Sequence, residues 1–175
     1  MPSIKRYALV VLLMFVLLAL ATIPACAPSV EPLLGPEEPE IPGEPDLSTP
    51  QAAVTSYLTL LNFSYRMANS EAAASAMTSA EWVRVDAYIQ LNCTKNRAIE
   101  QHLDLFEGAL RSIEASRAIV TATEDWRYRY FDLDSVLYTS DVLSISYETT
   151  YTVLQQSDGR WLVDSVEATS STPPQ

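Results

Sequence analysis

The amino-acid sequence predicts an α+β domain in which helices come first along the chain and long antiparallel strands follow. Two observations carry this prediction. Apolar residues recur every three or four positions between about residues 50 and 91, and every second position between about residues 118 and 169. No proline interrupts the chain from Gln51 to Thr172. Segregated helices and strands are typical of this class, so we expect two or three N-terminal helices packed on an antiparallel sheet of three to four strands.

The first helix is expected from about Pro50 to Met67. Before it, Ser48-Thr49-Pro50-Gln51 combines a hydroxyl cap, a proline in the first turn and a glutamine able to return the capping hydrogen bond. Side chains spaced by three and four then form one apolar face of the helix. They are Val54, Tyr57, Leu58, Leu61, Tyr65 and Ala68.

Two shorter helices are expected next. Ser70 can cap an alanine-rich helix, Glu71–Met77. A second capping box, Thr78 to Glu81, opens a helix that reaches about Leu91. Its inward-facing residues are expected to be Trp82, Val85 and either Tyr88 or Ile89.

The segment from Asn92 to Glu114 fits two structures. A helix would align Leu103, Phe106, Leu110 and Ile113, whereas a strand with a bulge near Gly108 would align Leu103, Leu105, Ala109 and Ile113. We favour the strand, ending at Ile113, because the next segment has the pattern of its hairpin partner.

The last third of the chain has the alternation of β-strands. In Ala118–Phe131, one side carries Ala118, Val120, Ala122, Glu124, Trp126, Tyr128 and Tyr130. In Val142–Leu154, one side carries Leu143, Ile145, Tyr147, Tyr151 and Val153. Asp158-Gly159 indicates a tight turn into a last strand, Arg160–Thr169. These segments predict an antiparallel meander.

The chain divides into segments of different composition. We assign residues 1–25 to a signal peptide, 26–47 to a lipidated cysteine and an acidic proline-rich linker, 48–170 to the domain and 171–175 to a disordered tail. Seven of the eleven prolines lie between Pro28 and Pro50, and Ala27–Leu47 holds six acidic residues and no basic one. Proline and like charges favour an extended semi-rigid tether. At about 3.1 Å per residue it would reach roughly 65 Å.

The N-terminal segment predicts where the protein is located in the cell. Lys5-Arg6 precedes Tyr7–Ile23, which carries no charge, and Ile23-Pro24-Ala25-Cys26 resembles the lipobox of bacterial lipoproteins. The resemblance implies that Cys26 is acylated and becomes the mature N-terminus, which would anchor the protein in the cell membrane on its extracytoplasmic side. A plain signal peptide or an uncleaved anchor are the alternatives.

Composition excludes several classes of function. With 22 acidic residues against 11 basic ones, the chain lacks the clustered cations that nucleic acid binding requires. Two cysteines cannot form a disulfide framework or a four-cysteine zinc site, and a single histidine, His102, excludes multi-histidine metal sites. The sequence contains no phosphate-binding glycine loop, so we expect no cofactor and no metal.

The body of the chain resembles the nuclear transport factor 2-like (cystatin-like) fold. More narrowly, the segments Ser116–Glu124, Tyr147–Val153 and Asp158–Val163 resemble the inner-membrane-space domain of plastid division proteins. The resemblance implies a curved sheet whose concave face holds a long helix, so that helix and sheet enclose a cone. Such folds include both enzymes and protein-binding domains, so the fold does not choose the function.

Six residues are candidates for contact with a ligand or partner: Glu124, Trp126, Tyr128, Tyr147, Tyr151 and Trp161. Glu124 shares its strand side with aromatic residues, and it could act as a base if that side faces the cone. The aromatic residues could equally be core. His102 could also serve acid–base chemistry, but we expect no catalytic residue.

The favoured hypothesis is a lipoprotein whose non-catalytic domain binds another protein or forms a homodimer through the sheet. The alternative is a small apolar ligand, or acid–base chemistry, in the cone. A polar-rimmed cavity that reaches Glu124 would favour the alternative, whereas a cone filled by Tyr57, Leu61 and Trp126 would not.

Overall fold

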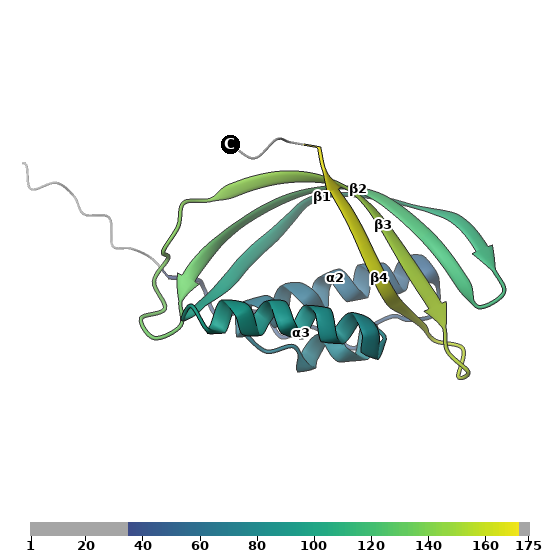
Figure 1. Cartoon of the computed structure of the whole chain (residues 1–175), viewed down its shortest axis with the longest axis horizontal. Helices are drawn as coiled ribbons and strands as arrows, with labels where there is room; N and C mark the ends of the chain where they lie inside the picture. The colour runs from purple at the N-terminus through teal and green to yellow at the C-terminus, as the bar shows by residue number, and fades with distance from the viewer. Residues whose placement is uncertain (1–34, 172–175) are drawn as a thin grey trace, which may run out of the picture. The chain divides into compact units, whose positions relative to one another are not determined.

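The computed structural model describes residues 35–171, in which helices precede strands as predicted (Figure 1). The helical part comprises α2 (Pro50–Met67), the 3-10 helix η1 (Glu71–Ala76) and α3 (Ser79–Cys93). The strands are β1 (Arg97–Glu114), β2 (Arg117–Asp132), β3 (Leu143–Gln155) and β4 (Trp161–Ser170). The α+β prediction is therefore confirmed. The signal peptide and Cys26 lie outside the described residues.

Side-chain caps set the start of both long helices. The Thr49 hydroxyl accepts a hydrogen bond from the Ala52 amide at 3.2 Å, and the Thr78 hydroxyl accepts one from the Glu81 amide at 3.5 Å. At the other end of α2, Ala68 takes a left-handed conformation with φ of 51° and stops the helix. The predicted helix over residues 50–67 is confirmed, and the alanine-rich segment is a 3-10 helix.

The inner face of α3 differs in part from the prediction. Val85 and Ile89 are buried, which settles the choice between Tyr88 and Ile89, whereas Trp82 is only half-buried and Tyr88 is exposed. Glu81 is buried on the same face as Val85. A helix spacing of four residues brings these two positions onto one side.

The sheet is a four-stranded antiparallel meander in the order β1-β2-β3-β4. The segment that fitted both a helix and a strand is β1, paired along its length with β2. The bulge expected near Gly108 is wrong: the register shifts lie between Leu103 and Leu105 and between Leu110 and Ser112. Gly108 instead leaves room for the Phe106 ring, because a Cβ at position 108 would lie 2.6 Å from that ring.

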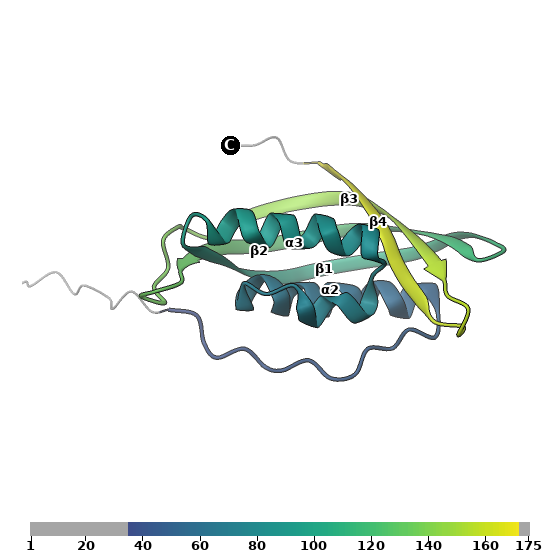
Figure 2. The ribbon, with the colours of Figure 1, turned by 60° about the horizontal axis from the view of Figure 1, so that its bottom comes forward.

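The sheet arches over the helices, and α2 and α3 lie side by side under its concave face (Figures 1 and 2). The core forms between these two layers. Its buried apolar side chains come from the helices and from the inward-facing positions of β2, β3 and β4. Every buried apolar side chain in the described part of the chain belongs to residues 47–163. A chain from Ala27 to Gln175 therefore retains this core entire.

The last part of the proline-rich segment belongs to the domain. We placed the domain boundary at Ser48, but Leu47 is only 6% exposed, and its carbonyl accepts a hydrogen bond from the Trp161 amide at 2.9 Å. Before it, the described segment from Gly35 has no helix or strand and runs along α2 (Figure 2). Its prolines at every third position are half-buried, namely Pro36, Pro39, Pro42 and Pro45. Three residues per turn is the period of polyproline II, so one face of the segment packs.

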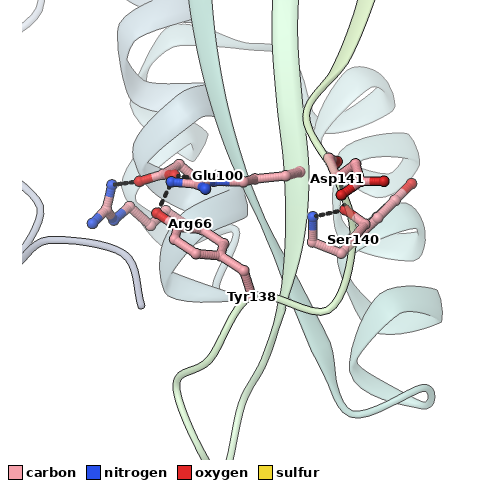
Figure 3. A network of polar contacts seen from close by, with 7 residues as sticks. Arg66, Glu100, Tyr138, Ser140 and Asp141 are labelled. Atoms are coloured by element: carbon pink, nitrogen blue, oxygen red, sulfur yellow. Dashed lines mark hydrogen bonds and ion pairs between the residues drawn. The ribbon is translucent and has the colours of Figure 1, made fainter. Parts of the chain in front are cut away.

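A polar network fixes the β2–β3 loop to the rest of the fold (Figure 3). Buried Glu100 on β1 accepts hydrogen bonds from Arg66 of α2 at 2.6 Å, from Arg129 of β2 at 3.2 Å and from the Tyr138 hydroxyl of the loop. Burial alone would raise the pKa of Glu100, but these three partners together hold it below its usual value.

Candidate functional site: a cavity between the helices and the sheet

A cavity of about 450 Å³ lies between the two long helices and the concave face of the sheet. Its walls come from α2, α3 and all four strands. Tyr57, Leu61 and Trp126, the residues that could have filled the cone, line this cavity instead. These side chains do not fill the space between the helices and the sheet, so the cone is partly hollow and open to solvent.

Glu124 lies in the wall of the cavity and is only 3% exposed. The alternation of β2 turns this side chain to the concave face, as the sequence predicted. One carboxylate oxygen accepts a hydrogen bond from the Trp126 indole at 2.8 Å, and the other accepts one from the Tyr151 hydroxyl. These contacts hold the carboxylate in one orientation. Burial, followed by the charge of Glu124, raises the pKa of Tyr151, which keeps that hydroxyl a donor.

A second buried carboxylate, Glu81, faces the same cavity from α3. It accepts a hydrogen bond from the Tyr57 hydroxyl at 3.1 Å and an ion-paired one from Arg84 at 2.6 Å. Burial raises the pKa of Glu81, and the bonds from Arg84 and Tyr57 oppose this rise. Burial likewise raises the pKa of Tyr57. The cavity wall therefore combines aromatic and aliphatic side chains with two buried carboxyl groups, of which Glu81 is paired with Arg84.

Tyrosine rings surround the two carboxylates. Tyr65 and Tyr88 meet edge to face with centroids 5.6 Å apart, and Tyr128 and Tyr147 extend the wall on the sheet side. Thr149 follows Tyr147 on the same face of β3. Its hydroxyl is buried and has no hydrogen-bond partner in the described structure. An unsatisfied buried hydroxyl in a cavity wall is available to a ligand.

The structure brings five of the six sequence candidates together. Glu124, Trp126, Tyr128, Tyr147 and Tyr151 all line the cavity. Trp161 does not, because it lies at the start of β4 and packs in the core.

Two other reactive side chains, His102 and Cys93, lie away from the cavity. His102 is exposed and does not line the cavity, since it alternates with Gln101, which does. Cys93 is a free, half-buried thiol at the end of α3 that packs against the core.

The sequence did not single out Glu81 as a site residue. We assigned its side chain to a helix cap, where it would return a hydrogen bond to the backbone, but it bonds to Tyr57 and Arg84 instead. The available signal was its spacing of four and eight residues from Val85 and Ile89, which places it on the inner face of α3. A charged residue at such a position is unusual.

Neither a metal cluster nor a membrane span is found within residues 35–171. No group of three or more His, Cys, Asp and Glu side chains in this range is placed to hold a metal ion. No helix in this range is both long and apolar enough to cross a membrane.

The fold of the domain is similar to that of three solved structures, one of which is described as nuclear transport factor 2-like. The chain resembles the intermembrane space region of the chloroplast protein ARC6, with 16% identity and a TM-score of 0.52 over 76% of this chain and 100% of that one. A nuclear transport factor 2-like superfamily protein from Salmonella enterica serovar Typhimurium is 10% identical, with a TM-score of 0.49 over 70% and 91% of the two chains. A ketosteroid isomerase-like protein from Erwinia carotovora atroseptica is 14% identical, with a TM-score of 0.48 over 73% and 97%.

These identities are low, so the comparisons define the fold and leave the choice of function to the site. No family sequence model and no curated protein sequence matches the chain.

Proposed function

We propose that the domain binds a small, largely apolar ligand in the cavity between α2, α3 and the sheet. The observation that carries this proposal is a cavity of about 450 Å³ walled by tyrosines and a tryptophan, with fixed polar groups at Glu124, Glu81 and Thr149. Ligand pockets in proteins are typically apolar cavities of roughly 300 to 1,000 Å³ with a few convergent polar groups. The hollow cone therefore favours ligand binding over the packed cone that a purely structural role would need.

A substitution at the rim tests this proposal. Ala168 is an exposed alanine of β4 that lines the cavity, and a tryptophan there would occupy its space. We expect the neutral dye Nile red to bind the chain from Ala27 to Gln175, and Ala168→Trp to weaken that binding at least tenfold. Ala109→Trp is the matched control, because Ala109 is an exposed sheet alanine that does not line the cavity. Equal binding by all three proteins would contradict the proposal.

We further propose that the protein is a lipoprotein that carries this domain on the extracytoplasmic side of the cell membrane. The support is the segment Ile23-Pro24-Ala25-Cys26 at the end of an uncharged run, followed by the proline-rich connector. Labelling of the full chain with radioactive palmitate tests it, with Cys26→Ala as the control. Label on the wild type alone is expected. Label on neither protein would overturn the assignment.

Protein binding is the second candidate, and exposed apolar side chains in or beside the β2–β3 loop favour it. They are Val136, Leu137, Val142 and Leu143. Large apolar side chains exposed to water can mark contacts with another protein. Light scattering on the chain from Ala27 to Gln175 would detect a homodimer, and Val142→Asp should dissociate it.

An acid–base reaction in the cavity would depend on Glu124 and not on His102, because of these two residues only Glu124 lines the cavity.

A further inference from the structure

We infer that the cavity selects an organic cation, a protonated amine or quaternary ammonium group on a small apolar body, and that this cation lies against Glu124. The inference rests on the proposed function, since it names the chemical class of the ligand that the same cavity takes. It follows from the charges in the cavity wall, from the donors around Glu124 and from the aromatic rings beside it.

The charges in the cavity wall do not balance. The lining contains three charged side chains, the carboxylates of Glu81 and Glu124 and the guanidinium of Arg84. Arg84 is bound to Glu81 at 2.6 Å, and its side chain is 59% exposed. Among the residues that the structure describes, no lysine, arginine or histidine forms an ion pair with Glu124. Glu124 is thus a buried carboxylate without a counterion.

The contacts of Glu124 orient its charge without neutralising it. The Trp126 indole and the Tyr151 hydroxyl are both neutral donors, one on each oxygen. A carboxylate has about four lone-pair sites, so each oxygen can accept another hydrogen bond. A buried charge is costly unless it is paired with an opposite one. A cationic ligand supplies that partner, whereas a neutral ligand does not and an anionic one is repelled.

The rings around Glu124 suit the same ligand. Tyr147 lies directly opposite Glu124 on the neighbouring strand, and Trp126 and Tyr128 follow on the same face of β2. The faces of tyrosine and tryptophan rings carry negative potential and attract ammonium and guanidinium groups. The domain uses this attraction elsewhere, since the guanidinium of Arg97 lies 3.9 Å from the centre of the Tyr130 ring.

The Thr149 hydroxyl near Glu124 narrows the class of ligand further. Thr149 pairs with Ala122, two positions from Glu124 on the same face of the sheet, so Thr149 and Glu124 are diagonal neighbours whose backbones lie roughly 7 Å apart. A ligand that carries a second polar atom as well as its cation would satisfy both groups.

Three ligands with one skeleton and different charges test the inference. We would titrate the chain from Ala27 to Gln175 with 3-phenylpropan-1-amine, 3-phenylpropan-1-ol and 3-phenylpropanoate, and follow calorimetric heat and tryptophan fluorescence. We expect the amine to bind at least tenfold tighter than the alcohol, and the acid weakest. Glu124→Gln should abolish the advantage of the amine while it leaves the affinity for the alcohol within about twofold.

The outcomes separate this inference from the proposed function. If the alcohol binds as well as the amine, or Glu124→Gln keeps the advantage of the amine, the inference is overturned and the cavity remains a ligand site. If none of the three compounds nor Nile red binds, the proposed function itself fails. If Glu124→Gln does not fold, Tyr147→Leu decides, because it removes a ring but no charge: a selective loss for the amine supports the inference, and an equal loss for amine and alcohol contradicts it.

Discussion

Tyr57 of α2 and Tyr151 of β3 meet edge to face in the wall of the cavity, with ring centroids 6.3 Å apart and planes at 73°. Each donates its hydroxyl to a different buried glutamate, Tyr57 to Glu81 and Tyr151 to Glu124. The pair therefore joins the helical layer to the sheet through both rings and both hydroxyls.

Removal of the Tyr57 hydroxyl should destabilise the fold. Tyr57→Phe leaves Glu81 with Arg84 as its remaining partner, and a buried acceptor that loses a donor typically costs about 1 to 3 kcal/mol. We expect a loss in this range in the free energy of unfolding, measured by urea titration. Tyr65→Phe is the control, because it removes a hydroxyl from the same wall that has no such bond to a glutamate, and a loss as large there would contradict the assignment.

Stability should fall with rising pH because of Glu81. Its pKa in the folded protein is raised above the usual 4.5, so between these two values the folded state holds a proton that the unfolded state has released. In that window the free energy of unfolding decreases as pH rises. Glu81→Gln should remove this part of the slope in urea titrations between pH 4 and 7. Identical slopes for wild type and variant would show that Glu81 has no raised pKa.

Loss of the Glu100 carboxylate should lower the free energy of unfolding more than loss of a surface carboxylate does. Glu100→Gln leaves Arg66, whose side chain is 15% exposed, without its counterion, and an unpaired buried charge typically costs about 3 kcal/mol. The pKa of Glu100 is lowered, so its stabilising effect is fully present above pH 4.5 and is lost as pH falls through the lower pKa of the folded state. Urea titrations should show a smaller deficit at pH 3 than at pH 7.

Asp104→Asn is the control for that variant. Asp104 pairs with Arg127 on β2, but both side chains are more than a third exposed, so water already solvates the charges. We expect almost no change in unfolding free energy. An equal effect of the two substitutions would mean that the Glu100 network does not fix the β2–β3 loop.

Leu47 should behave as a core residue although it lies in the proline-rich segment. Leu47→Ala removes a buried side chain, and such substitutions typically cost about 2 to 5 kcal/mol. The matched control is Ile41→Ala in the same segment, because Ile41 is 81% exposed. The midpoint temperature of thermal unfolding should fall clearly for Leu47→Ala and not for Ile41→Ala. Equal falls would show that Leu47 is not part of the domain core.

The elements could be predicted because local signals determine them. The cap at Thr49 and the repeated apolar spacing define α2, and the alternation from Ala118 to Trp126 defines β2 and its inward face. That alternation also placed Glu124 correctly among aromatic side chains. These features depend on neighbours in the sequence, so a single chain is enough to see them.

The rest depends on residues that are distant in sequence. The volume of the cone is set by how far α2 and α3 stand from the sheet, and no local pattern encodes this distance. The pairing of Glu81 with Tyr57 was missed for the same reason, since Tyr57 lies 24 positions earlier. The bulges of β1 were misplaced because Gly108 accommodates the Phe106 ring, a contact that the sequence does not distinguish from a bulge.

Because the proline-rich segment packs on the domain, the linker to the proposed anchor is shorter than the sequence suggested. Gly35 lies so close to the β2–β3 loop that a Cβ on it would be 1.9 Å from the Val136 carbonyl oxygen, while Leu47 is bonded to the start of β4. The segment between them is therefore committed to the domain. If Cys26 carries the proposed anchor, only residues 27–34 remain as spacer, and eight residues reach at most about 29 Å. Such a protein would sample the water layer next to its membrane and little beyond it.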